Sequence, residues 1–108
     1  MFLRIISGKL KPGTWDQYEK AYREAVAEAG AIDGLVGRWL TRDTDDPDAG
    51  TTVSLWSTES AMKAYEQSDV LKNTINARLA PFFSGEFRTS TTKVCYAEGD
   101  PVPRDWAK

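Results

Sequence analysis

Residues 51–66 read TTVSLWSTESAMKAYE, and this stretch joins a strand to a helix. Its first part is rich in β-branched and aromatic side chains, which favours a strand that ends at Trp56. Ser57 or Thr58 then supplies a hydroxyl that can cap the N-terminus of a helix. Apolar side chains recur at helical spacing after the cap. The stretch therefore predicts a β-α unit, and the remaining elements can be placed outward from it.

Downstream, the apolar stripe of the helix continues past a short polar interruption. Residues 67–69 read Gln-Ser-Asp and predict a break, with Ser68 as a new cap. Pro81 limits how far the second part of the helix can run. The predicted buried face consists of Met62, Tyr65, Leu71, Ile75, Leu79 and Phe82. A long strand is predicted over residues 85–96, where the apolar neighbours of Cys95 favour its burial.

Upstream, residues 35–42 predict a strand in which Leu35 and Trp39 share one face. The aspartate-rich loop at residues 43–50 lacks the later glutamate of an EF-hand, so it is interpreted as a hairpin. Residues 2–10 predict the first strand. Thr14 and Gln17 have the spacing of a capping box and open a helix that ends at Gly30. The apolar face of that helix comprises Trp15, Tyr18, Tyr22, Ala25, Val26 and Ala29.

The order of elements is β-α-β-β-α-β, which predicts an α+β, ferredoxin-like fold. In this fold a four-stranded antiparallel sheet carries two helices on one face. The first three strands are apolar on both alternation phases, so the other face also needs a cover. A second copy of the chain would supply it, as in a dimeric α/β barrel; the alternative is a monomer with an apolar patch. We expect a domain at residues 1–97 and an irregular tail at residues 98–108, with Trp106 in the tail.

Composition excludes several classes of function. The 108 residues carry a net charge of −2 without a basic patch, which argues against nucleic acid as a partner. No apolar run could span a membrane or form the core of a signal peptide, so we expect a cytoplasmic protein. The chain has no histidine and one cysteine. It therefore lacks the usual general base, zinc ligand and haem ligand, and we expect neither metal nor cofactor.

The residues 54–62, SLWSTESAM, continued by Tyr65 and residues 68–72, resemble the antibiotic biosynthesis monooxygenase family of dimeric α/β-barrel proteins. The turns at residues 11–14 and 33–35 fit the same family, and the resemblance extends to the tail in order of elements. It implies a cleft between sheet and helices that is lined by aromatic side chains. Cofactor-free members of the family oxidise phenolic polyketides there, and other members degrade haem.

The haem-degrading branch combines an asparagine, a tryptophan and a histidine. Trp56 matches the tryptophan on the third strand. The asparagine position falls near Ile6 or Ser7, and the histidine position falls on Ile75. Two of the three residues are therefore missing, and the resemblance does not imply haem degradation for this chain.

The candidate site residues are aromatic, amide and arginine side chains. We expect Trp56, Asn73 and Arg38 to act in catalysis, and Tyr22, Tyr65, Arg88 and Ile75 to contact a substrate. Asn76 is an alternative to Asn73, since only one of them needs to face the cleft, and Arg4 is a third strand arginine. Each also has a structural explanation: core packing for the aromatics, solvation for the amides, and a sheet edge or a carboxylate such as Glu86 for the arginines.

Three functions remain open from the sequence. The chain could be a cofactor-independent monooxygenase that oxidises an electron-rich aromatic, such as a phenol or hydroquinone, with O2. It could instead be a non-catalytic binder of a small molecule, or an isomerase-like relative on the same fold. The third hypothesis is a structural dimerisation module with a filled cleft, because the fold alone does not decide function.

Overall fold

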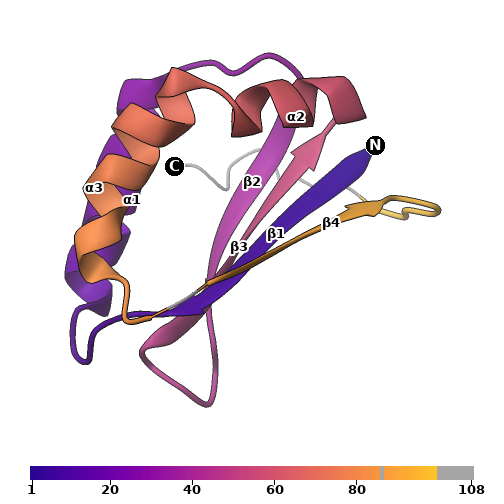
Figure 1. Ribbon diagram of the computed structural model, residues 1–108. Helices are drawn as coiled ribbons and strands as arrows, with labels where there is room; N and C mark the ends of the chain where they lie inside the picture. The colour runs from indigo at the N-terminus through magenta and orange to yellow at the C-terminus, as the bar shows by residue number, and fades with distance from the viewer. Residues whose placement is uncertain (86, 100–108) are drawn as a thin grey trace.

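The computed structural model describes residues 1–85 and 87–99, and its four strands form one antiparallel sheet. The strands lie in the order β2-β3-β1-β4, as Figure 1 shows. Their bounds are β1 Phe2–Lys9, β2 Leu35–Arg42, β3 Ala49–Trp56 and β4 Arg88–Lys93. The order of elements and the sheet confirm the predicted ferredoxin-like α+β fold.

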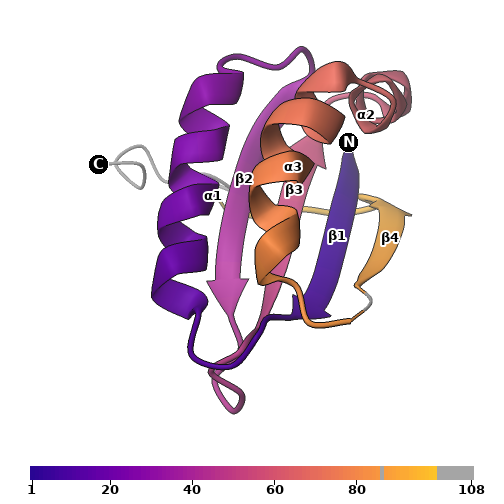
Figure 2. The same ribbon diagram turned by 60° about the vertical axis from the view of Figure 1, so that its left-hand side comes forward.

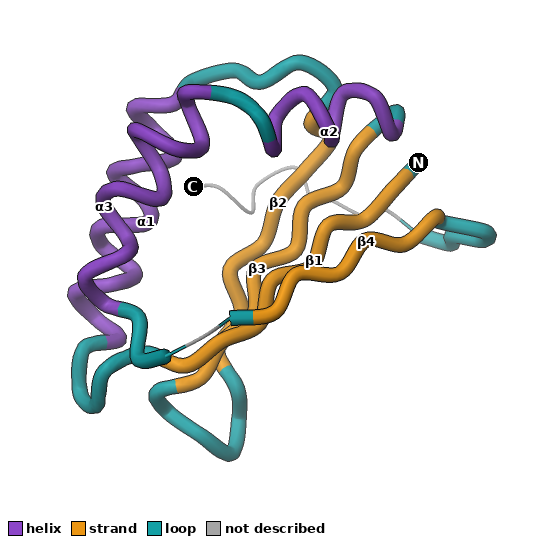
Figure 3. The backbone as a smooth tube through the Cα atoms, viewed as in Figure 1, coloured by secondary structure: helices purple, strands orange, loops and turns teal. Residues whose placement is uncertain are grey.

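The helices lie on one face of this sheet. They are α1 Trp15–Ala29, α2 Glu59–Glu66, the π-helix η1 Val70–Asn76, α3 Ala77–Leu79 and the 3₁₀-helix η2 Ala80–Phe82. Figure 2 shows α1 and α3 side by side in front of the strands, and Figure 3 shows α2 near the end where β3 finishes. The second predicted helix is thus divided, with its break at the predicted position. Within the described residues, no helix is long and apolar enough to cross a membrane.

Helix capping agrees with the sequence at two of three positions. The Ala61 amide donates to Thr58 Oγ1 at 3.1 Å, and the Leu71 amide donates to Ser68 Oγ at 3.2 Å. The predicted capping box at Thr14 is wrong, because its hydroxyl donates to the Lys11 carbonyl at 2.7 Å instead of receiving a helix amide. The Thr14 hydroxyl therefore stabilises the turn before α1 and does not cap the helix.

A register shift in β2 decides which side chains of that strand face the helices. Leu35 pairs with Trp56 and Gly37 with Leu55, so Val36 is an extra residue between them. Leu35 consequently packs on the helix side, whereas Trp39 pairs with Val53 on the other side. The prediction that Leu35 and Trp39 share a face is wrong, because a bulge inverts the alternation between them.

The hydrophobic core lies between the sheet and the helices. Its buried members are Leu10, Trp15, Tyr18, Ala25, Trp56, Met62, Tyr65, Leu71, Ile75 and Leu79. This set confirms most of the predicted buried face of each helix; Tyr22, Ala29 and Phe82 are only partly buried against it, and Val26 is not part of it. The face opposite the helices carries Leu3, Ile5, Trp39 and Val53; Val53 pairs with both Ile5 and Trp39, and Leu3 pairs with Leu55.

The last strand is shorter than predicted. β4 covers only Arg88–Lys93 of the expected residues 85–96, and every residue in it is exposed. Cys95 follows the strand and is exposed, so the prediction of its burial is wrong. The prediction of a tail with Trp106 concerns residues that lie, from residue 100 onward, outside the described part of the chain.

Candidate functional site

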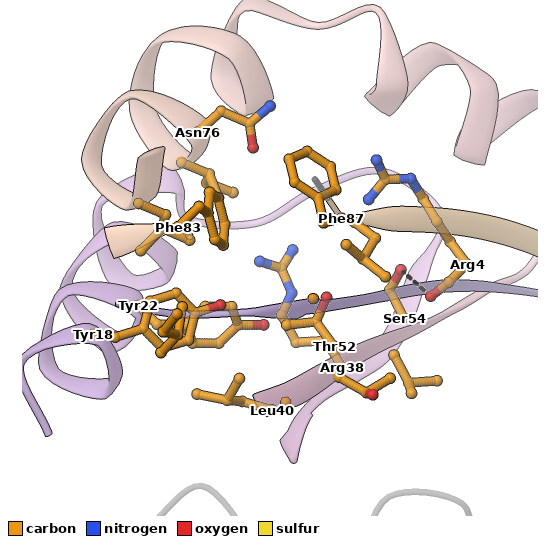
Figure 4. Close-up of a pocket in the computed structure, with 18 of the residues that line it drawn as sticks. Arg4, Tyr18, Tyr22, Arg38, Leu40, Thr52, Ser54, Asn76, Phe83 and Phe87 are labelled. Atoms are coloured by element: carbon orange, nitrogen blue, oxygen red, sulfur yellow. Dashed lines mark hydrogen bonds between the residues drawn. The ribbon is translucent and has the colours of Figure 1, made fainter. Parts of the chain in front are cut away.

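A cleft lies between the helix-facing side of the sheet and the helices. It encloses about 810 Å³ of space free of atoms, counting its open mouth. The cavity proper is only about 80 Å³, and the larger figure includes space that is open to solvent. The strands contribute Arg4, Ile6, Arg38, Leu40, Thr52 and Ser54, and the helices and the segment after them contribute Tyr18, Tyr22, Tyr65, Ile75, Asn76, Phe83 and Phe87. Figure 4 labels ten of these residues, and their side chains surround one space.

The floor of the cleft includes a polar row within a strand phase that is otherwise mixed, since Ile6 and Leu40 also line it. Ser54 pairs with Arg4 on one side and with Arg38 on the other, so the three residues form a row across the sheet. Directly paired residues in antiparallel strands point to the same face. Both guanidinium groups therefore rise from the sheet toward the helices, as the Arg4 and Arg38 side chains do in Figure 4.

Trp56 lies next to this floor, on the same face of β3 as Ser54. Its side chain is completely buried, and its indole Nε1 donates to Ser54 Oγ at 2.8 Å. The Ser54 hydroxyl in turn donates to the Arg4 carbonyl at 3.5 Å. The Trp56 ring lies 4.9 Å from the Tyr65 ring at an angle of 37°. Trp56 thus fixes Tyr65 without being one of the residues that line the cleft.

The two arginines differ in their charge partners. Arg4 Nε lies 3.5 Å from Glu66 Oε2 but makes no hydrogen bond. Among the described residues, Arg38 has no carboxylate within ion-pair distance, and no carboxylate lines the cleft. Glu86, a partner considered from the sequence, lies outside the described residues. Both guanidinium carbons are near one ring: those of Arg4 and Arg38 lie 5.8 Å and 5.9 Å from the centre of Tyr65.

The tyrosines of the cleft remain neutral. Burial raises the pKa of Tyr22, and the nearby Arg38 charge offsets part of that rise. Burial also raises the pKa of Tyr65, against the opposing effects of Arg38 and then Arg4. For Tyr18, burial and then the neighbouring Tyr22 raise the pKa to about 12. Their hydroxyls can therefore donate hydrogen bonds at physiological pH.

The helical wall adds one amide and an aromatic mouth. η1 places the consecutive residues Ile75 and Asn76 at the cleft, and π-helical segments are frequent at functional sites. Asn76 extends from this wall toward the sheet in Figure 4. Phe83 and Phe87 lie with ring centres 5.2 Å apart, and Phe87 is 45% exposed. The pair can offer ring faces to a planar ligand that enters.

The described part of the chain contains no cluster of metal-ligating side chains. No group of three or more histidine, cysteine, aspartate or glutamate side chains is placed to hold an ion there. The site instead combines aromatic walls, hydroxyl donors and an arginine that has no carboxylate partner among residues 1–85 and 87–99. Such an arrangement suits a planar ligand with an anionic or electron-rich oxygen.

Comparison with protein families assigns the chain. A model of the family "Antibiotic biosynthesis monooxygenase" matches residues 1–77, which include the cleft strands β1–β3 and most of its helical wall. The chain belongs to the antibiotic biosynthesis monooxygenase family. No curated protein matches the chain.

Solved structures show the same fold at low sequence identity. A candidate antibiotic biosynthesis monooxygenase from Bordetella bronchiseptica has a TM-score of 0.77 and 20% identity, covering 88% of this chain and 97% of that protein. A second candidate, from Caulobacter crescentus, has a TM-score of 0.76 and 18% identity over 88% and 90% of the two chains. A protein of unknown function from Nitrosomonas europaea has a TM-score of 0.74 and 14% identity, covering 94% and 95%.

Within this monooxygenase fold, four predicted site residues come together. Tyr22, Tyr65, Arg38 and Ile75 all line the cleft. Trp56 lies behind Tyr65 rather than in the lining.

Two predicted residues are not brought to the cleft. Asn73 is exposed on η1, and the alternative Asn76 is the amide in the lining. Arg88 is exposed and pairs with Ser7, in the phase of the sheet that faces away from the helices.

Sequence reasoning missed part of this family member's cleft. Ser54, Thr52, Phe83 and Phe87 were not predicted as site residues. The signal for the first two is that Thr52 and Ser54 are polar residues at alternate positions of one strand. No comparable signal marks the two phenylalanines, because they lie outside regular strands and α-helices.

Proposed function

We propose that this chain is a cofactor-independent monooxygenase that oxidises an electron-rich phenol or hydroquinone with O2 in the cleft. The observation that carries the proposal is Arg38, which enters an aromatic cleft without a carboxylate partner among the described residues. A guanidinium in this position stabilises a phenolate, the form of a phenol that reacts most readily with oxygen. Membership of the family supports the same reaction class.

The proposed reaction balances without a flavin or a metal. The bound phenolate passes one electron to O2, which gives a phenoxyl radical and superoxide. The pair combines at a ring carbon to form a peroxide, and loss of water leaves a carbonyl at that carbon. One oxygen atom ends in the quinone and the other in water, while the phenol O–H and the ring C–H supply the two protons. All four electrons come from the substrate, so the substrate does the work that a cofactor usually does.

The chain's own residues bind, orient and shield this substrate. Tyr65 and the Phe83–Phe87 pair hold the ring, and Arg38 faces the phenolate. The Tyr22 hydroxyl and the Asn76 amide can donate hydrogen bonds to the carbonyl that forms. Trp56 positions Tyr65 by packing on its ring and positions Ser54 by a hydrogen bond. Asn73 and Arg88, predicted from sequence, have no part in this arrangement.

A second candidate function is non-catalytic binding of a small aromatic molecule. It is favoured by the absence of a carboxylate from the described lining of the cleft, which leaves no side chain there to act as a strong base. Oxidation then depends on the acidity of the substrate and on Arg38. A binder would show the same ligand preferences without consuming oxygen.

The functional unit that we propose is a homodimer in the cytoplasm. Two sheets would pack through the faces that carry Leu3, Ile5, Trp39 and Val53, away from the helices. Burying these side chains between two copies would remove apolar surface from water. The clefts would then lie on the two outer sides of the paired sheets.

Oxygen consumption tests the proposal. Polycyclic phenols and hydroquinones are supplied to chelator-treated protein, and oxygen uptake is followed with quinone absorbance. Arg38→Gln should lower kcat/KM by about 10- to 100-fold, the loss expected when a hydrogen bond to a charged group is removed. The control is Arg23→Gln, on the exposed side of α1, which should leave the rate unchanged. If binding occurs but the wild type oxidises no substrate faster than buffer does, the binding function replaces the oxygenase.

A further inference from the structure

The charges around the cleft do not cancel. Two guanidinium groups approach the Tyr65 ring within 6 Å, and one carboxylate, Glu66, lies beside one of them. The side chain of Arg4 is 12% exposed and that of Glu66 is 29% exposed, so this pair is only partly screened by water. The described residues thus leave one positive charge, that of Arg38, for a ligand.

Glu66 occupies an unusual position for a carboxylate. It is the last residue of α2, where the helix dipole disfavours negative charge. Its neighbour in the chain, Tyr65, is the ring near both arginines. Lys63, in the last turn of the same helix, pairs with Glu59 rather than with Glu66. The contact of Glu66 is with Arg4, on β1.

We propose that Glu66, by occupying Arg4, determines which ligand charge the cleft accepts, so that the cleft selects aromatic molecules with a single negative charge. This inference rests on the proposed function for the role of the cleft in binding an aromatic ring. It adds that the ring is bound as a monoanion and that Glu66 is a specificity-determining residue.

A neutral ligand would leave the partly buried Arg38 without a counter-charge, which is costly when the ligand removes its water. A dianion would bring a second negative charge next to Glu66, because Arg4 is already engaged there. Like charges at such distances repel in a site of low dielectric. A monoanion satisfies Arg38 and leaves the Arg4–Glu66 pair undisturbed.

The geometry of the Arg4–Glu66 contact would allow Arg4 to leave Glu66 and bind an anionic ligand instead. Arg4 Nε is buried, and it has no hydrogen-bond partner although Glu66 Oε2 is 3.5 Å away. The pair is held by charge rather than by an aligned hydrogen bond. If the carboxylate is neutralised, Arg4 becomes available as a second anion site on the other side of Ser54.

The test measures binding of three naphthalene probes by fluorescence, at a pH where all their carboxyl groups are ionised. The probes are 2-naphthamide, 2-naphthoate and naphthalene-2,3-dicarboxylate, which share a ring and carry no charge, one charge and two charges. The wild type should bind the naphthoate about tenfold or more tightly than the amide. The dicarboxylate should bind no more tightly than the naphthoate.

Glu66→Gln removes the proposed selector, and Glu59→Gln on the same helix is the matched control. In Glu66→Gln the affinity for the dicarboxylate should rise by about tenfold relative to that for the naphthoate. Glu66→Asp retains the charge and should keep the wild-type selectivity, as should Glu59→Gln. The double variant Arg4→Gln with Glu66→Gln should return to monoanion preference, which a merely structural effect of Glu66 would not produce.

The outcomes separate this inference from the proposed function. Equal binding of the amide and the naphthoate by the wild type would overturn the selection of anions while leaving aromatic binding intact. A dicarboxylate affinity that changes no more in Glu66→Gln than in Glu59→Gln would overturn the role of Glu66. If none of the three probes binds and no phenol is oxidised, the proposed function itself fails.

Discussion

The hydrogen bond between Trp56 and Ser54 offers the sharpest test of how the cleft is built. Trp56→Phe keeps an aromatic ring in the core but removes the Nε1 donor that reaches Ser54 Oγ at 2.8 Å. Trp56→Ala is a poorer choice, because truncating a completely buried tryptophan costs about 3–5 kcal/mol. That loss is a large part of the roughly 5–15 kcal/mol that stabilises a domain. Lost activity would then report unfolding rather than a role in the site.

The expected magnitude for Trp56→Phe follows from two contributions. The lost hydrogen bond contributes about 1 kcal/mol net. The smaller ring leaves space beside Tyr65, whose ring centre is 4.9 Å away, and this adds about 1 kcal/mol or somewhat more. We therefore expect the free energy of unfolding to fall by about 2–3 kcal/mol, the order set by these two terms.

A double-mutant cycle isolates the bond itself. Trp56→Phe, Ser54→Ala and the double variant are unfolded with urea, and the coupling free energy should be about 1 kcal/mol. Because Trp56 lies outside the lining, Trp56→Phe should change the affinity for 2-naphthoate less than Arg38→Gln does. A coupling energy indistinguishable from zero would refute the reasoning that this bond fixes the floor of the cleft.

Four further outcomes are expected. Gly50→Ala should destabilise the fold by about 1–3 kcal/mol in urea unfolding, because a Cβ there would lie 2.7 Å from the Trp15 ring. The pKa of Tyr18 is raised to about 12 in the folded state, against 10.0 ordinarily. Its contribution to stability, about 2–3 kcal/mol, is therefore complete below pH 10 and is lost as the pH rises toward 12. Tyrosinate absorbance and the unfolded fraction should rise together over this range. Val53→Lys should convert a dimer to a monomer in light scattering, and a wild type that is already monomeric would contradict the proposed assembly. Prolonged chelation should leave oxygen uptake unchanged, and a loss restored by one metal would refute cofactor independence.

Much of the fold was predictable because its signals are local. The strand that ends at Trp56, the cap at Thr58 and the break before Ser68 each depend on a few adjacent residues, and the structure confirms all three. The capping box at Thr14 failed because its hydroxyl has a competing partner in the turn before the helix. The predicted length of β4 failed at its C-terminal end because β4 ends at Lys93, which pairs with Phe2, the first residue of β1.

The candidate site was predictable only in part. Tyr22, Tyr65 and Ile75 were found because helical periodicity or the family resemblance points to them, and all three line the cleft. Asn73 could not be distinguished from Asn76 by periodicity, since η1 is a π-helix and turns less per residue than the α-helix assumed. For Arg88 the sequence predicted only that the residue lies in a strand. It did not indicate which face of the sheet the Arg88 side chain would be on.

The sequence by itself determined the order of elements, the helical stripes, the absence of histidine chemistry and the family. These depend on residue types and on spacings of a few positions, which the chain carries whether or not it is folded. Only the tertiary structure decided which strand phase faces the helices, because the bulge at Val36 inverts one strand against its own pattern. It alone brought Arg4, Ser54 and Arg38 into one row and set Glu66 beside only one of the two arginines. Pairing between strands is a relation between distant segments, and no local pattern encodes the charge that it leaves unbalanced.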